Sequence, residues 1–423
     1  MTNKHRSGVD FIIYVFLIIF IFCLIYSPRF SEHNTVHLLF FVSLFLMPFL
    51  FRSAIYVLKK SIVVKFCSIF FLISLYSTLI AFLGGEKISI ETLVNIPVEL
   101  GFCVIFILSI MKRRKMSPSD MLDIIIYAGV IQSLICCAMV VLPGFRNLIN
   151  DFRSHFWDDR LMGWAETRML GFADGLFHTT PIVQAIISIF LIKKAETKPI
   201  LFLFVITTLL SALLNSRTSF VLWLLCLPFY FLGSSSAKKR IRIIVIAIIT
   251  LLFSSVIISL LNEGAGEAMT YFISGMQEID SATKGKREGF FSSVDKFFVF
   301  PSGVDFIFGI GSDTYSKILN PEYKGIHSDY GFVNNVWSYG IVGTIFMLNL
   351  YFRTIKNCLI VNLNFSKLIF YVLLIAFVVG HFKGIITYYN DFTALLLLIS
   401  SSSILNNNYQ NEKNNVGCPN HTS

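Results

Sequence analysis

Long apolar runs separated by short polar stretches dominate this chain of 423 residues. An α-helix needs about 18 to 20 apolar residues to cross the ~30 Å hydrocarbon core of a bilayer. Twelve runs approach or reach that length, some of them with the help of flanking residues: Phe11–Tyr26, Val36–Phe51, Ile62–Phe82, Leu93–Met111, Met121–Leu142, Pro181–Ile192, Ile200–Leu214, Thr218–Leu232, Ile241–Leu261, Phe332–Phe352, Leu368–Val379 and Phe392–Leu405. The apolar positions do not alternate with the period of two that is typical of a barrel. The pattern therefore predicts an all-α polytopic membrane protein with about twelve transmembrane helices.

The basic residues predict the orientation of these helices, because Lys and Arg collect in cytoplasmic segments. With a cytoplasmic N-terminus and alternating helices, most of the 35 Lys and Arg fall in inner segments, whereas each short outer loop holds one. Both termini are then cytoplasmic. We predict one transmembrane domain over residues 1–405 and a disordered cytoplasmic tail over residues 406–423.

Two long outer loops, residues 143–180 and 262–330, hold most of the non-membrane chain. A twelve-helix transporter usually has a long inner connection after its sixth helix. Here that connection is the short segment Lys193–Pro199. The arrangement favours chemistry at the outer membrane face over alternating access.

The composition supports the membrane class and excludes others. The hydrophobic fraction is 55% and the charged fraction 14%, and mean hydropathy is +0.72. The formal charge of +10 follows from the basic inner segments, and no basic, aromatic-interleaved domain indicates nucleic acid as a partner. Most of the eight cysteines lie in apolar runs, and no Cys-x-x-Cys or Cys/His cluster predicts a metal. We expect no cofactor.

Arginine and lysine near the outer ends are candidates for binding phosphate. Arg217 begins the eighth apolar run, and Lys286 and Arg287 stand in the second outer loop. The guanidinium group matches phosphate oxygens two at a time and keeps its charge. The alternatives are snorkelling of Arg217 to the headgroups and a solvated charge run in the loop. Because Phe290–Phe308 is apolar, we expect it to form a short amphipathic helix at the membrane interface.

Three further residues are candidates for proton transfer or binding. His327 and Asp329 precede the tenth helix, whose N-terminus favours anions, and His titrates near neutrality. Glu99 lies about six residues inside the fourth apolar run. Because a carboxylate in hydrocarbon is costly, Glu99 is expected to face a cavity or a partner, as a base or as an anchor for Lys or Arg.

The order of short motifs resembles the O-antigen polymerase and O-antigen ligase superfamily (the Wzy and WaaL types). The motifs that carry the resemblance span residues 151–347 and are Arg168-x-x-Gly171-Phe172, Asn215-Ser216-Arg217-Thr218, Arg287, Phe308-Gly309-Ile310-Gly311, His327-Ser328-Asp329-Tyr330-Gly331 and Asn334 followed by Tyr339-Gly340-Ile341-Val342-Gly343. Many members have Asn after the motif His, where this chain has Ser328.

This resemblance implies a GT-C-like, metal-independent glycosyltransferase of the bacterial inner membrane. Its donor is an undecaprenyl-diphosphate-linked glycan, and its active site faces the periplasm. Catalytic roles are implied for Arg217, Arg287 and His327. Substrate-binding roles follow for a second set, which is Arg168, Glu99, Lys286, Asp329, Tyr330 and Asn334. Membrane lipids and a chain-length regulator of the Wzz type are the expected partners. Polymerase is preferred over ligase, and a flippase for the same lipid-linked unit is the third alternative.

Overall fold

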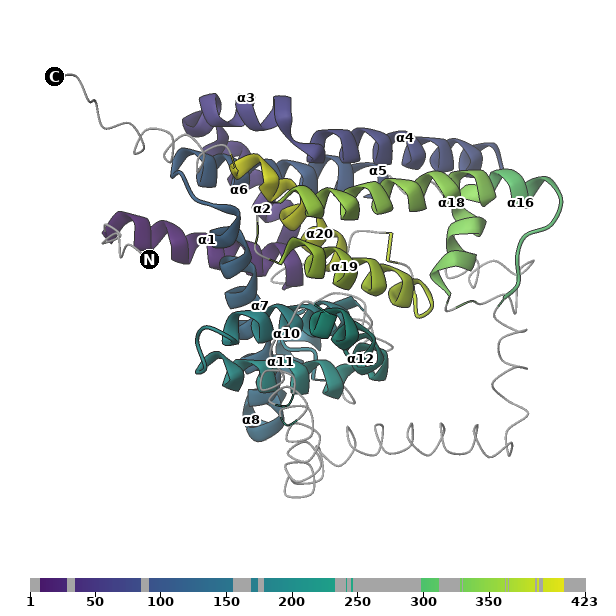
Figure 1. Ribbon diagram of the computed structural model, residues 1–423. Coiled ribbons are helices and arrows are strands. Elements are labelled where there is room, and N and C mark those ends of the chain that lie inside the picture. Colours follow the sequence, from purple (N-terminus) through teal and green to yellow (C-terminus); the bar gives the residue numbers. More distant parts are fainter. Residues whose placement is uncertain are drawn as a thin grey trace, which may run out of the picture.

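The computed structural model describes residues 8–28, 35–84, 91–154, 169–173, 179–232, 241, 245, 298–311, 328, 330–361, 363, 365–384, 386–387 and 391–406. Within these residues every regular element is helical (Figure 1). The helices are α1 (Gly8–Tyr26), α2 (Thr35–Leu46), η1 (Met47–Leu50), α3 (Phe51–Lys60), α4 (Ile62–Leu83), α5 (Glu91–Val94), η2 (Asn95–Leu100), α6 (Gly101–Arg113), α7 (Pro118–Val141), α8 (Pro143–Ser154), α10 (Thr179–Ala195), α11 (Leu201–Asn215), α12 (Arg217–Leu232), α16 (Val304–Phe308), α18 (Gly331–Asn357), η4 (Cys358–Ile360), α19 (Ser366–His381), α20 (Asp391–Ser401) and η5 (Ser402–Leu405).

The helices are those of an all-α membrane protein. Among the described residues, five helical segments are long and apolar enough to cross a bilayer: Gly8–Tyr26, Thr35–Lys60, Ile62–Leu83, Asn95–Arg113 and Pro118–Val141. Shorter apolar helices follow at Leu201–Asn215, Thr218–Phe231, Ser366–His381 and Asp391–Leu405. Every predicted apolar run except the ninth falls on a described helix, and the ninth lies outside the described residues apart from residues 241 and 245. The number of spans and their orientation stay predictions.

Local sequence signals explain several helix boundaries. Ser117 caps α7 in a capping box with Asp120, and Pro118 occupies the first helical position, where a missing N–H costs nothing. The Ser61 hydroxyl accepts from the N–H of Val63 and starts α4. Pro48 lies in the tight turn η1, which separates α2 from α3. These boundaries follow from residues close in sequence.

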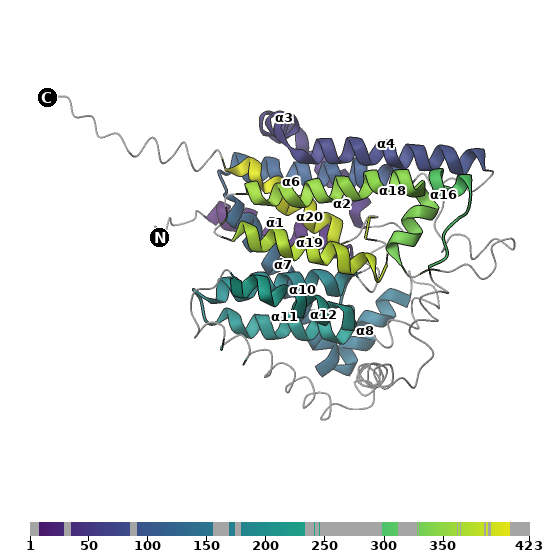
Figure 2. The ribbon, with the colours of Figure 1, turned by 45° about the vertical axis from the view of Figure 1, so that its right-hand side comes forward.

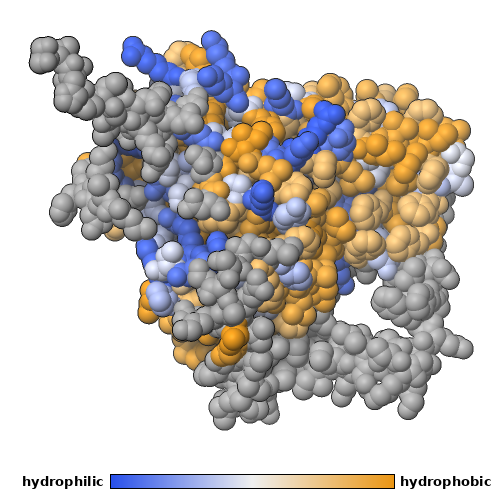
Figure 3. Space-filling model, viewed as in Figure 1, coloured by the Kyte–Doolittle hydropathy of each residue, from blue (hydrophilic) through white to orange (hydrophobic). Residues whose placement is uncertain are grey.

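The helices pack side by side into one bundle with two tiers. Figures 1 and 2 show α4, α6, α18, α19 and α20 together, with α10, α11 and α12 beside them. The helices α10 and α20 are buried along almost their whole length, so they form the centre of the bundle. Helices α1, α2 and α4 instead expose many large apolar side chains. Figure 3 shows a broad apolar surface at the upper right, where Figure 1 places α4 and α18, and such a surface suits contact with lipid chains.

The structure adds detail to one predicted loop and corrects one expectation. Residues 143–154, in the predicted first outer loop, form the short helix α8. An amphipathic helix was expected over Phe290–Phe308, yet within the described residues 298–311 the helical part is Val304–Phe308. Pro301 and Gly303 explain the late start, since Pro lacks an N–H donor and Gly303 has φ of 60°.

Candidate functional site

Buried polar side chains from several helices meet at one end of the bundle. Thr180 at the start of α10 donates a hydrogen bond to Asp391 at the start of α20. The Gln184 Nε2 group donates to the Tyr26 hydroxyl at the end of α1 (3.0 Å) and its Oε1 accepts from Ser133 (2.6 Å). The starts of α10 and α20 and the end of α1 therefore lie together. We call this end of the bundle the polar end; in the predicted topology it faces outward.

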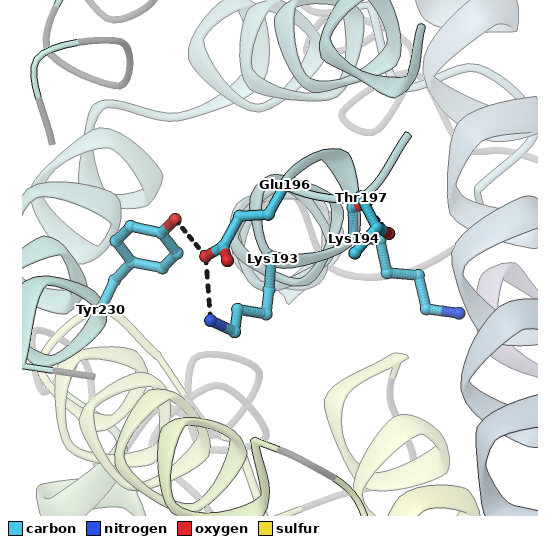
Figure 4. A network of polar contacts seen from close by, with 5 residues as sticks. All are labelled: Lys193, Lys194, Glu196, Thr197 and Tyr230. Carbon is cyan, nitrogen blue, oxygen red and sulfur yellow. Dashed lines mark hydrogen bonds and ion pairs between the residues drawn. The ribbon is translucent and has the colours of Figure 1, made fainter. Parts of the chain in front are cut away.

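The opposite end of the bundle is basic and carries ion pairs. At the end of α10, Lys193 Nζ lies 2.9 Å from Glu196 Oε1, which also accepts from the Tyr230 hydroxyl (2.5 Å). Figure 4 shows Lys194 on the other side of α10, where it pairs with Asp123. We call this end the basic end. The two ends thus differ in chemistry, with buried side chains joined mostly by hydrogen bonds at one and Lys–carboxylate ion pairs at the other.

At the polar end, a short non-helical segment, residues 169–173, is held by side chains from three helices. The Asn215 side chain of α11 donates to the Met169 carbonyl (2.9 Å), and Gln132 of α7 donates to the Leu170 carbonyl (2.7 Å). Arg153 of α8 donates to the carbonyls of Gly171 and Ala173. Carbonyls buried away from water need such donors, so these bonds fix the segment inside the bundle.

Gly171 is required at this place. Its φ is +58°, and a Cβ there would collide with the Gln132 amide. The segment directly follows Arg168, and Asn215 stands two residues before Arg217. The Asn215–Met169 bond therefore brings together the two chain segments that carry these predicted arginines. Arg168 lies outside the described residues, and the structure describes the backbone of Arg217 but not its side chain.

A second close approach joins residues 308–311 to a break in α18. Gly340 interrupts that helix with φ of 65° and ψ of 176°. The N–H of Ile310 donates to the Trp337 carbonyl (2.8 Å), and the Tyr76 hydroxyl of α4 donates to the Phe308 carbonyl (2.9 Å). A Cβ at Gly309 would collide with the Gly340 backbone. The glycines of the two motifs thus allow their backbones to touch.

Asn334 folds the residues in front of α18 into a turn. Its Nδ2 group donates to the carbonyls of Ser328 (2.8 Å) and Tyr330 (3.1 Å). The Ser328 hydroxyl accepts from the Tyr330 N–H (3.2 Å), so Ser328 makes the local turn bond that an Asn side chain also makes. Asn334 was predicted to bind substrate, which stays a prediction; its Nδ2 group supports the turn in front of α18. His327 and Asp329 lie outside the described residues.

The next residue, Asn335, ties α18 to the turn between α19 and α20. Its Oδ1 accepts from Thr387 Oγ1 (2.8 Å) and its Nδ2 faces His381 Nε2 (3.4 Å). His381 Nδ1 faces the Phe377 carbonyl (2.8 Å) and therefore carries the ring proton. His381 is fully buried, with ring contacts to Phe332 and Phe377. This histidine is part of the packing between helices.

Glu99 is buried in the π-helical turn η2 and its partner is His37 of α2. The carboxylate Oε1 is bonded to His37 Nδ1. The Glu99 side chain is 8% exposed and that of His37 33% exposed. The expectation that Glu99 faces a partner is confirmed, but the partner is an imidazole rather than Lys or Arg. A π-turn adds a residue to the helix and often marks a functional position.

The structure leaves other predicted site residues untested. Arg287 and Lys286, like Arg168, His327 and Asp329, lie outside the described residues. Tyr330 is described and its ring contacts that of Phe298 (4.3 Å between centroids). The pattern did not single out His37, Gln132 or Asn335, which the structure places in buried polar contacts. The sequence feature that could have identified these three residues is a polar side chain within an apolar stretch.

Two further observations concern metal binding and similarity to known proteins. Within the described residues, no group of three or more His, Cys, Asp or Glu side chains has the arrangement of a metal site. No protein-family model, curated protein or solved structure matches the chain.

Proposed function

We propose that this protein is an O-antigen polymerase, or a polymerase of a related surface polysaccharide. It transfers an undecaprenyl-diphosphate-linked chain to the terminal sugar of a new lipid-linked repeat unit, at the periplasmic face of the inner membrane. The observation that carries the proposal is the order of the motifs from Arg168 to Gly343 between outer ends of apolar helices.

The contacts at the polar end support this proposal. The Asn215–Met169 bond joins the neighbours of two predicted arginines. Gly309 and Gly340, from two motifs, touch at the backbone. Asn334 braces the residues around the His327 motif. Motifs that are far apart in sequence therefore contribute to the same polar end, as a shared site requires.

The chemistry needs charge stabilisation and removal of one proton. The acceptor hydroxyl oxygen forms a bond to the anomeric carbon of the donor sugar while the bond from that carbon to the diphosphate oxygen breaks. Undecaprenyl diphosphate leaves with the bonding electrons, and the hydroxyl proton is released. In this proposal Arg217 and Arg287 bind the diphosphate, as fixed cations offset the charge that develops there. His327 contacts the acceptor hydroxyl or the phosphate, and Arg168 supports the diphosphate.

The test replaces the two proposed diphosphate ligands. In the native host, Arg217→Ala and Arg287→Ala are expected to abolish surface polymer while membrane levels of the protein stay normal. Lipopolysaccharide gels and an epitope-tag blot measure the two quantities. Arg353→Ala is the matched control, because Arg353 is exposed on the far half of α18 and bonds its helical neighbour Asn349. Full-length polymer in both variants would refute the assignment.

A gene deletion separates the alternatives. Loss of a polymerase leaves a single repeat unit on the lipid core. Loss of a ligase leaves no repeat unit at all, and loss of a flippase traps the lipid-linked unit on the cytoplasmic face. Only the first outcome agrees with the proposal.

A further inference from the structure

Helix α3 lies across the bundle at the basic end. It follows the Pro48 turn of η1. Figure 2 shows it end-on, whereas α4 runs across the view. Ala54 and Val57 are buried on its inner side, while Phe51 and Leu58 are 63% and 46% exposed. A crosswise helix with one packed side and exposed apolar groups beside cations has the character of a helix at the membrane surface.

Cations from two helices converge on one aromatic ring of α3. The Nζ atom of Lys60 lies 5.0 Å from the centroid of the Tyr56 ring, and that of Lys112 of α6 lies 4.5 Å from it. We call Tyr56, Lys60 and Lys112 the α3 cluster. Arg52 and Lys59 are exposed on the same helix. Figure 3 shows hydrophilic side chains gathered over the upper left, where Figure 1 places α3.

A guanidinium group joins this region to the end of α2. Arg113 of α6 donates to the Phe49 carbonyl in η1 (2.5 Å). The Phe49 side chain is 70% exposed. The turn that redirects the chain into α3 is therefore held by a cation, with an apolar side chain pointing outward beside it.

The α3 cluster brings two ammonium groups from different elements to one ring. Both positive charges attract an anion that lies beside the ring.

From this geometry we infer that the α3 cluster binds the phosphate of an anionic phospholipid in the leaflet at the basic end. Phosphate oxygens accept hydrogen bonds from Lys60 and Lys112, and the tyrosine hydroxyl is the polar tip of an amphipathic ring at headgroup depth. The exposed Phe49, Phe51 and Leu58 contact the acyl chains. These apolar groups favour a lipid over free phosphate, because free phosphate has no apolar part that could contact them. The inference is independent of the proposed catalytic function.

The test measures lipid selectivity of the full chain. The protein is purified in detergent and titrated with phosphatidylglycerol and with phosphatidylcholine of the same acyl chains, and bound lipids are counted by native mass spectrometry. The wild type is expected to prefer phosphatidylglycerol. The double variant Lys60→Gln/Lys112→Gln is expected to lose about tenfold or more of that preference, because each cation near an anionic lipid contributes roughly fivefold to binding.

The matched control removes two charges elsewhere. Arg353 and Lys356 are exposed on the far half of α18, and Arg353→Gln/Lys356→Gln is expected to keep the preference. The charge-conserving Lys60→Arg/Lys112→Arg variant is also expected to keep it. Melting temperature and gel-filtration profile confirm that each variant is folded.

Three results would overturn the inference. The first is an equal loss of selectivity in the control pair, which would mean that net charge alone attracts the lipid. The second is unchanged selectivity in the glutamine pair. The third is displacement of the bound lipid by millimolar inorganic phosphate, which would identify a free-phosphate site. If the glutamine pair does not fold, Arg52→Gln/Lys59→Gln replaces it, since both side chains are exposed and must still lower the preference.

Discussion

At the scale of the residue, the Glu99–His37 pair shows that a carboxylate buried in an apolar bundle is paired with a polar side chain of another helix. A charged group in hydrocarbon is costly unless a partner offsets its charge. Glu99 in η2 meets His37 of α2, 62 positions earlier in the chain. The pair therefore fastens α2 onto the π-turn.

We expect the two residues to stabilise the protein together rather than independently. Glu99→Gln and His37→Gln should each lower the free energy of unfolding by about 1–3 kcal/mol, because each leaves a partly buried polar partner without its charge-assisted bond. The double variant should cost less than the sum of the two, since partners in contact are not additive. Melting temperatures in detergent measure these effects, and strict additivity would show that the contact contributes nothing.

At the scale of the element, the break in α18 decides where its first turns lie. Figure 1 shows α18 bent, with its short first part turned away from the long second part. The Ser77 hydroxyl of α4 donates to the Ser338 carbonyl (3.1 Å), which lies just before Gly340. Residues 307–310 contact the backbone at the bend. The bend directs Asn334 and Asn335 toward the polar end.

Gly340→Ala should prevent this arrangement. The conformation at Gly340 is one that residues with a Cβ rarely adopt, and the added methyl would collide with the Ile307 carbonyl. We expect little folded protein, measured as monodisperse material after detergent extraction.

Gly303→Ala is the control for that substitution. Gly303 also has a positive φ of 60°, but nothing lies within 4 Å of a Cβ there. It bears the backbone strain without the collision and should cost about 1–3 kcal/mol. Equal damage from both substitutions would mean that strain, and not the approach of the two backbones, matters at Gly340.

At the scale of the whole molecule, the two ends of the bundle carry different polar groups. Lys193, Lys194 and Glu196 form ion pairs at the basic end, whereas Thr180, Gln184 and Asn335 are buried at the polar end. Cytoplasmic segments of membrane proteins are rich in Lys and Arg. The basic end is therefore the end that the predicted topology places in the cytoplasm.

Thiol labelling tests this orientation. In a variant without the native cysteines, Lys383→Cys and Lys198→Cys place single thiols on exposed turns at opposite ends. A membrane-impermeant maleimide applied to spheroplasts should label position 383 and leave position 198 unlabelled until the membrane is opened. His327→Cys should behave like position 383. Labelling of 198 but not of 383 would reverse the orientation and remove the periplasmic site.

Part of the candidate site was visible in the sequence. Asn215, Gly309 and Gly340 stood in the motifs, and the structure places them in contacts that hold these motifs in position. The pattern gave no indication that His37 meets Glu99 or that Gln132 holds Leu170. One polar residue in an apolar run shows that some partner is needed, but not which one, because the partner comes from a helix elsewhere in the chain. The grouping of Arg217, Arg287 and His327 stays a prediction.

By itself, the sequence determined the helices and their membrane setting. In hydrocarbon every backbone N–H and C=O must be paired inside the protein. A continuous apolar run lacks the alternation of a barrel strand, so a helix, which pairs these groups within one segment, is the structure that the run predicts. Tertiary structure alone decided the bend at Gly340 and the crosswise direction of α3. It also decided the hydrogen bonds that hold residues 169–173 to the side chains of Asn215, Gln132 and Arg153. The physical reason is that these features depend on which helices pack together, because packing decides which residues far apart in the sequence come into contact.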